Sequence, residues 1–153
     1  MPKYWIIAVS EDNWQVIKKD NVYGAPETLG TRSPTRLIEP GDVIIFYVKM
    51  RGSKSLGGKF VGAFRVVSQW YRENRPMWPD EVGEGKVKYP WRVRLEPIKL
   101  GIADFRELVP RLRFVEKKER AHAYLVGTPA NLRRPISEED AKVIIESLGN
   151  LII

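Results

Sequence analysis

Three runs of apolar residues constrain what this chain can fold into more than any other feature of its sequence. They span residues 3–9, 43–48 and 60–68 and consist largely of aromatic and β-branched residues, which favour strands. We expect the first run to be buried on both faces of a sheet. Gly62 interrupts the third run, and a glycine there favours a β-bulge or the close approach of another segment. The sequence therefore predicts a sheet at the centre of the molecule.

Helices are predicted on both sides of this strand-rich centre. Ser10 is a candidate N-cap for a short helix that runs to about Lys19. Ser137 is a candidate N-cap for a second helix, because three acidic residues follow it and Gly149 comes after the last turn. This helix has apolar residues at a spacing of three and four, namely Ala141, Ile144, Ile145 and Leu148. The order of elements indicates one β-rich α+β domain spanning residues 1–153.

Less regular segments are predicted between these elements. Six glycines and prolines in residues 20–41 indicate a long ordered loop, with one helical turn near residues 35–38. Residues 70–85 are expected to be irregular, and residues 87–99 are expected to return to a strand. Helical or turn-like structure is expected in residues 104–112 and 116–123.

The composition excludes several classes of functional site. Without cysteine, the chain has no disulfide, thiolate metal ligand or cysteine nucleophile. The single histidine, His122, excludes multi-histidine metal motifs, and we expect it to be structural. No Walker loop or dinucleotide-binding glycine motif occurs, and Gly52–Gly58 has the wrong spacing for a phosphate-binding loop. Asp80, Glu81 and Glu84 are expected to be solvated. We therefore expect a protein that is not an enzyme and needs no cofactor or metal ion.

The hydropathy pattern predicts a soluble, cytoplasmic protein. Hydrophobic residues make up 43% and charged residues 29% of the chain, so wholesale disorder is excluded. No apolar run approaches the roughly 18 residues of a membrane span, and residues 1–10 lack the apolar core of a signal peptide. The absence of cysteine, the two glutamines and the many charged residues are typical of thermophilic proteins.

The positive charge of the chain is concentrated in one segment. The formal net charge is +7, and residues 49–75 contain seven basic residues against the single acid Glu73. This clustering favours a polyanionic partner such as nucleic acid, whereas a solvated charged face is the alternative. The candidate phosphate-binding residues are Arg32, Lys54, Lys59, Arg72 and Arg75.

Three aromatic residues at the edges of predicted elements are candidates for stacking on a nucleobase. Trp14, Tyr23 and Trp78 lie at the edges of predicted elements or in loops. Stacking of an aromatic side chain on a base contributes about 1–3 kcal/mol per base. We expect them to line one pocket whose polar wall consists of Ser10 and Asn13. Gly24, next to Tyr23, allows a planar group to approach closely. The alternative is that Trp14 belongs to the apolar face of its helix.

Several short motifs follow one another across residues 2–148 in an order that is specific as a set. They are Tyr4-Trp5, Asn13-Trp14, the Ile-Glu-Pro-Gly-Asp run at 38–42, Phe46-Tyr47, Phe60-Val61-Gly62, residues 67–71, Trp78-Pro79 and residues 89–93. This ordered set resembles the EVE domain of the PUA superfamily and is similar to small archaeal stand-alone members of that family.

The resemblance implies a fold and a class of ligand. The fold is PUA-like: a strongly bent mixed sheet that forms a pseudo-barrel, flanked by helices, with a pocket at one side. The family is related to the YTH domain, which reads methylated adenine in RNA through an aromatic cage. Ser10 to Asn13 resembles the polar YTH segment that hydrogen-bonds the base. Residues 22–24 resemble the segment that supplies one cage aromatic, with Tyr23 where YTH domains carry tryptophan. The implied ligand is a modified base of RNA or DNA.

Two other classes of function stay open from the residues alone. One is an RNA-modifying or nucleotide-processing enzyme that uses Asp42 or Asp80 as a base. The other is an adaptor whose cleft binds a peptide. Salt dependence distinguishes nucleic-acid binding from the adaptor, because neutralised phosphates make affinity fall steeply with salt.

Overall fold

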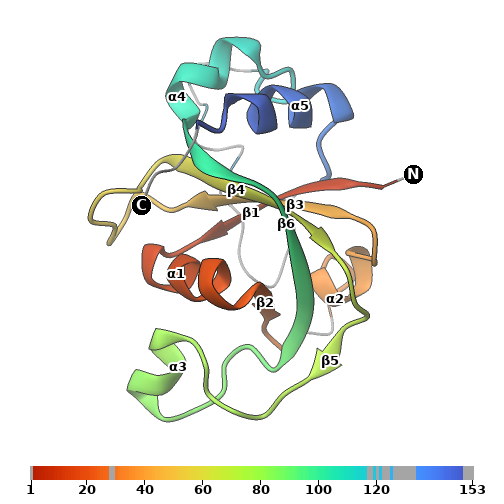
Figure 1. The fold of residues 1–153 in the computed structure, drawn as a ribbon, viewed down its shortest axis with the longest axis vertical. Helices are drawn as coiled ribbons and strands as arrows, with labels where there is room; N and C mark the ends of the chain where they lie inside the picture. Colours follow the sequence, from red (N-terminus) through yellow and green to blue (C-terminus); the bar gives the residue numbers. More distant parts are fainter. Residues whose placement is uncertain are drawn as a thin grey trace.

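The computed structural model describes residues 2–27, 30–116, 119, 121, 125 and 134–149. It shows a curled sheet with helices on both sides (Figure 1). The elements are, in chain order, β1 (Tyr4–Val9), α1 (Glu11–Asp20), β2 (Val22–Ala25), α2 (Pro34–Leu37), β3 (Val43–Val48), β4 (Lys59–Val66), β5 (Tyr71–Arg72), α3 (Pro79–Glu84), β6 (Trp91–Asp104), α4 (Phe105–Leu108), the 3-10 helix η1 (Val109–Arg111) and α5 (Glu138–Ser147).

The long strand β6 gives the sheet its bend. The strand order is β1-β3-β4-β6-β2, with β5 paired to β6 outside this path. The first part of β6 pairs with β2 and β5, and the later part pairs with β4. Only β1 and β3 are parallel among the strand pairs of the described residues. The predicted PUA-like bent mixed sheet with flanking helices is therefore confirmed as a six-stranded half-barrel.

Most predicted elements are present, and three were missed: β2, the two-residue β5 and α3. The strand at 43–48, the helix capped by Ser10 and the helix capped by Ser137 are all confirmed. Residues 22–25 form β2 and not a loop, because this short segment gains its hydrogen bonds from β6, far along the chain. Helix α3 lies in the segment that was expected to be irregular. Most of residues 116–123, including His122, lie outside the described residues.

The sheet separates two apolar clusters. Alternate residues of β1 serve both clusters: Trp5, Ile7 and Val9 belong to the one beside α1, and the residues between them pack against the one beside α5. The first strand was predicted to be buried on both faces; the face with Trp5, Ile7 and Val9 is buried, and the opposite face is partly buried. Gly62 also behaves as expected, since a Cβ there would lie 3.0 Å from the Trp14 ring and the pairing with β6 shifts register beside it.

Buried carboxylates hold loops to these elements. Asp42 is 3% exposed and accepts hydrogen bonds from the backbone N–H groups of Lys3 and Glu39 and from the indole N–H of Trp5, each at 3.0 Å. Asp140, in the first turn of α5, accepts two backbone N–H groups of the segment after η1 at 2.9 Å. Both acids therefore fix neighbouring chain segments through backbone N–H groups. Within the described residues, no helix has the length and apolar character needed to cross a membrane.

Candidate nucleic-acid interface

The first turn of α1 orients Asn13. Ser10 has an extended backbone, and its hydroxyl oxygen accepts the N–H of Asn13 at 3.1 Å, which is an N-cap. The cap starts the helix directly after β1 and fixes the residues of its first turn. The side chain of Asn13 forms a hydrogen bond with Tyr89, which lies just before β6.

Tyr89 connects α1 to α3. Its hydroxyl donates to Oδ2 of Asp80 at 2.6 Å, and its ring meets that of Trp78 edge-on with centroids 6.2 Å apart. Burial raises the pKa of Tyr89, and the hydrogen bond to Asp80 raises it further, so the hydroxyl stays protonated at physiological pH. We call Asn13, Gly24, Trp78, Asp80 and Tyr89 the Tyr89 cluster.

Gly24 brings β2 against this cluster. A Cβ on Gly24 would lie 2.8 Å from Nε1 of Trp78 and 2.9 Å from Cβ of Tyr89, so any larger residue must displace one of them. The side chain of Trp78 is buried, and its indole N–H has no hydrogen-bond partner within the part of the chain that the structure describes. An unpaired buried donor costs about 1–3 kcal/mol, and such a group calls for an explanation. The Tyr89 cluster therefore holds a buried donor whose hydrogen bond is not made within the described residues.

One buried carboxylate, that of Glu81 in α3, organises the segment that carries Trp78 and Tyr89. Its oxygens accept the backbone N–H groups of Met77, Trp78, Lys88 and Tyr89 at 2.8–3.1 Å. Burial raises the pKa of this carboxyl, but the four N–H groups lower it by more, so it lies below its ordinary value. A guanidinium nitrogen of the buried Arg92 lies 3.4 Å away. The prediction that Glu81 is solvated is wrong.

A local signal for α3 is present in the sequence. Pro79 occupies the first helical position, with Asp80 and Glu81 in the first turn, and this is a typical helix start. The aromatic neighbour Tyr89 has no such signal, because its role depends on contacts with Asn13 and Asp80 from other segments.

The other two predicted ring residues pack around Phe46. The ring centroid of Trp14 lies 6.0 Å from that of Phe46, and that of Tyr23 lies 5.8 Å from it. Both side chains are buried, and burial raises the pKa of Tyr23. Successive residues of a strand point to opposite faces, so the Tyr23 ring lies across β2 from Trp78. The structure thus brings Asn13, Gly24 and Trp78 together through Tyr89, and it packs Trp14 and Tyr23 against Phe46 in the apolar cluster that also contains Trp78.

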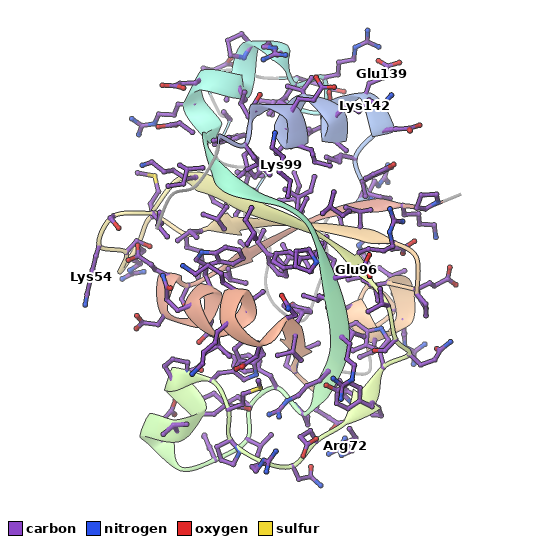
Figure 2. The ribbon with its side chains drawn as sticks, viewed as in Figure 1. Lys54, Arg72, Glu96, Lys99, Glu139 and Lys142 are labelled. Atoms are coloured by element: carbon purple, nitrogen blue, oxygen red, sulfur yellow. The ribbon has the colours of Figure 1, made fainter. Side chains whose placement is uncertain are left out.

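The predicted phosphate-binding residues are distributed over the surface. Figure 2 shows Lys54 on the loop beside α1 and Arg72 near β5, well apart. Lys59, partly buried, begins β4, and Arg32 and Arg75 are exposed. Arg72 is exposed, pairs with Glu27 and lies 5.4 Å above the ring of Trp91. These five cations do not form one compact patch.

Comparison with protein families identifies the chain's relatives. The model of the EVE domain family matches residues 3–147. A UPF0310 protein of Saccharolobus solfataricus is 40% identical over 98% of this chain and 97% of its own length. Another, from Pyrococcus abyssi, is 37% identical over 95% of this chain and 98% of its own length.

Solved structures with a similar fold include YTH domains. The Pho92 YTH domain in complex with m6A has a TM-score of 0.58 at 14% identity, covering 95% of this chain and 84% of its own. The Mmi1 YTH domain in complex with RNA has a TM-score of 0.57 at 16% identity, covering 95% and 81%. The protein Atu2648 from Agrobacterium tumefaciens has a TM-score of 0.54 at 17% identity, covering 94% and 91%. At these identities the likeness shows the fold.

Proposed function

Because this chain belongs to the EVE domain family, we propose that it is a nucleic-acid-binding module that recognises one base, a modified one, without catalysing a reaction. Two YTH domains of similar fold have been solved with m6A or with N6-methyladenosine RNA. They support a flipped base as the ligand, since recognition of this kind uses stacking together with hydrogen bonds to the base edge.

The unpaired indole N–H of Trp78 carries this proposal. Base edges present nitrogen and carbonyl acceptors, which an N–H donor can bind. Asn13 lies in the same cluster through Tyr89, and its amide offers both a donor and an acceptor. The Tyr89 cluster therefore combines two aromatic rings with polar groups of the kind that discriminate one base edge from another.

The remaining predicted residues have supporting roles in the proposal. Ser10 fixes Asn13 through the N-cap. Trp14 and Tyr23 pack against Phe46 in the aromatic core next to the site. The proposed phosphate contacts are Arg32, Lys54, Lys59, Arg72 and Arg75.

Binding without turnover is proposed because the two carboxylates considered as bases are engaged in the structure. Asp42 is buried and accepts three N–H groups. Asp80 accepts the hydroxyl of Tyr89 and the backbone N–H of Glu81. Both carboxylates are therefore occupied by hydrogen bonds that hold the fold together.

The test is a binding screen of modified and unmodified RNA and DNA oligonucleotides at two salt concentrations, with Trp78→Phe as the main variant. This substitution keeps an aromatic ring and removes the indole N–H. Trp70→Phe is the control, because the indole of Trp70 is already paired with the carbonyl of Ile38 at 3.0 Å. We expect Trp78→Phe to lose discrimination between bases and to keep its salt dependence, whereas Trp70→Phe keeps both. An equal loss of affinity for every oligonucleotide would contradict a base-reading role for Trp78.

A further inference from the structure

The loop between β3 and β4, residues 49–58, carries a concentration of positive charge. It contains Lys49, Arg51 and Lys54, all exposed, and no acidic residue. None of these three side chains forms an ion pair with any residue that the structure describes. Gly52 and Gly58 within it have φ values of 78° and 80°, which are accessible to glycine at little cost. A loop of this composition loses much conformational freedom when it is ordered.

Backbone hydrogen bonds to Val9 and Val48 hold the two ends of this loop, and one carboxylate oxygen anchors its centre. Oε1 of Glu11 accepts three successive backbone N–H groups, those of Lys54, Ser55 and Leu56, at 3.1, 3.0 and 2.8 Å. These hydrogen bonds, that of Leu56 first, lower the pKa of the Glu11 carboxyl, so the group is ionised at neutral pH. Three amides of the loop are thereby satisfied, and the side chains of Lys49, Arg51 and Lys54 are exposed.

The position of Glu11 connects this loop to the proposed base site. Glu11 is the first residue of α1, directly after the cap Ser10 and two residues before Asn13. One turn of helix therefore carries both the side chain that belongs to the Tyr89 cluster and the side chain that anchors the basic loop.

We infer that Glu11 is a positioning residue that holds the β3–β4 loop so that Lys49, Arg51 and Lys54 meet the phosphates of a strand whose base is bound at the Tyr89 cluster. This inference rests on the proposed function. A preordered loop binds more tightly, because the cost of ordering its backbone and long side chains is met in the free protein. An acidic residue thus strengthens the binding of a polyanion.

The direction in which a Glu11 substitution changes RNA affinity distinguishes a positioning role from a purely electrostatic one. Removing a negative charge beside a basic loop should strengthen the binding of a polyanion if charge alone matters. Asp12 provides the matched control, because it is exposed, lies in the same first turn and has no hydrogen bond or ion pair to a described residue. Glu11→Ala and Asp12→Ala therefore remove the same charge, and only the first removes the anchor.

The experiment measures the affinity of a short single-stranded RNA for the full chain and both variants over a range of salt concentrations. Asp12→Ala should bind as tightly as the wild type or slightly more tightly. Glu11→Ala should bind about fivefold more weakly or worse, because the ordering cost of one or two long side chains returns. Its dependence of log affinity on log salt should be flatter, since fewer phosphates are neutralised at once. Glu11→Gln keeps an oxygen acceptor without the charge, so its affinity should lie between those of the wild type and Glu11→Ala.

A second measurement tests the anchor without nucleic acid. Tryptic cleavage after Arg51 and Lys54 should be faster in Glu11→Ala than in the wild type and in Asp12→Ala. Equal cleavage rates in the three proteins, or equal RNA affinities of the two alanine variants, would overturn the inference and leave the proposed function standing. Failure of the wild type to bind any oligonucleotide would overturn the proposed function and the inference with it.

Discussion

Glu81→Gln is the substitution whose effect the structure predicts most sharply. The carboxylate of Glu81 has two oxygens, and each accepts two backbone N–H groups. A glutamine amide replaces one oxygen with an NH₂ group, so two of the four N–H donors lose their acceptor. The buried guanidinium of Arg92, 3.4 Å from Glu81, also loses its anion.

The free energy of unfolding should fall substantially. Removing one partner of a buried ion pair costs about 3–5 kcal/mol, and each hydrogen bond to a charged group contributes about 1.5–3 kcal/mol. These effects overlap, so we expect a loss of about 3–5 kcal/mol. For a chain of this size, one kcal/mol corresponds to about 2–4 °C, which gives a decrease in Tm of about 6–20 °C.

Thermal and urea unfolding at pH 7 are the measurements, with Glu84→Gln as the control. Glu84 is exposed and pairs with Lys88 on the surface, so its substitution should leave Tm nearly unchanged. Because the pKa of Glu81 is lowered in the fold, its stabilising contribution is complete above the unfolded pKa, about 4.3. The difference in stability between wild type and Glu81→Gln should therefore narrow as the pH falls below that value. A loss of less than about 1 kcal/mol at pH 7 would refute the role given to this carboxylate.

Two further substitutions test the site and the surface. Gly24→Ala should cost about 1–3 kcal/mol, as overpacking does, because its Cβ would lie 2.8 Å from Nε1 of Trp78; base discrimination should fall with it, and unfolding and binding measurements on the same variant check both effects. Replacing the four cations Lys54, Lys59, Arg72 and Arg75 with alanine should weaken the binding of all oligonucleotides similarly and flatten the salt dependence. Unchanged affinity and slope in that variant would place the electrostatic contact elsewhere on the protein.

The parts of the fold that were predicted correctly are those whose signals are local. β3 consists of six consecutive apolar residues, and all six are buried. α5 has its cap, its acidic first turn and its apolar spacing within one short stretch of sequence. β2 was missed because it has four residues, one of them glycine, and it is defined by pairing with β6.

The environment of the site residues was harder to predict, because it is set by partners that are distant in the sequence. Trp14 and Trp78 are both tryptophans near a helix start, yet Trp14 meets Phe46 and Phe64 whereas Trp78 meets Gly24 and Tyr89. Glu81 is buried because the chain returns at Lys88 and Tyr89 to donate to it. Residue type and spacing alone do not predict contacts of this kind between separate segments of the chain.

Stability and recognition depend on different kinds of charged residue in this protein. Asp42, Glu81 and Asp140 are at most 3% exposed and fix loops through backbone N–H groups. The cations Lys54 and Arg75 are exposed, and exposed charges contribute little to folding. Substitutions of the buried acids should therefore lower Tm and leave the salt dependence of binding intact, whereas substitutions of the exposed cations should do the reverse. Glu11 is the informative exception, because it is an acid that fixes a loop and, through that loop, alters binding. For each of these variants, Tm and the dependence of log affinity on log salt can be compared. If the Glu11 anchor serves recognition, Glu11→Ala should flatten the salt dependence, as the substitutions of the exposed cations do.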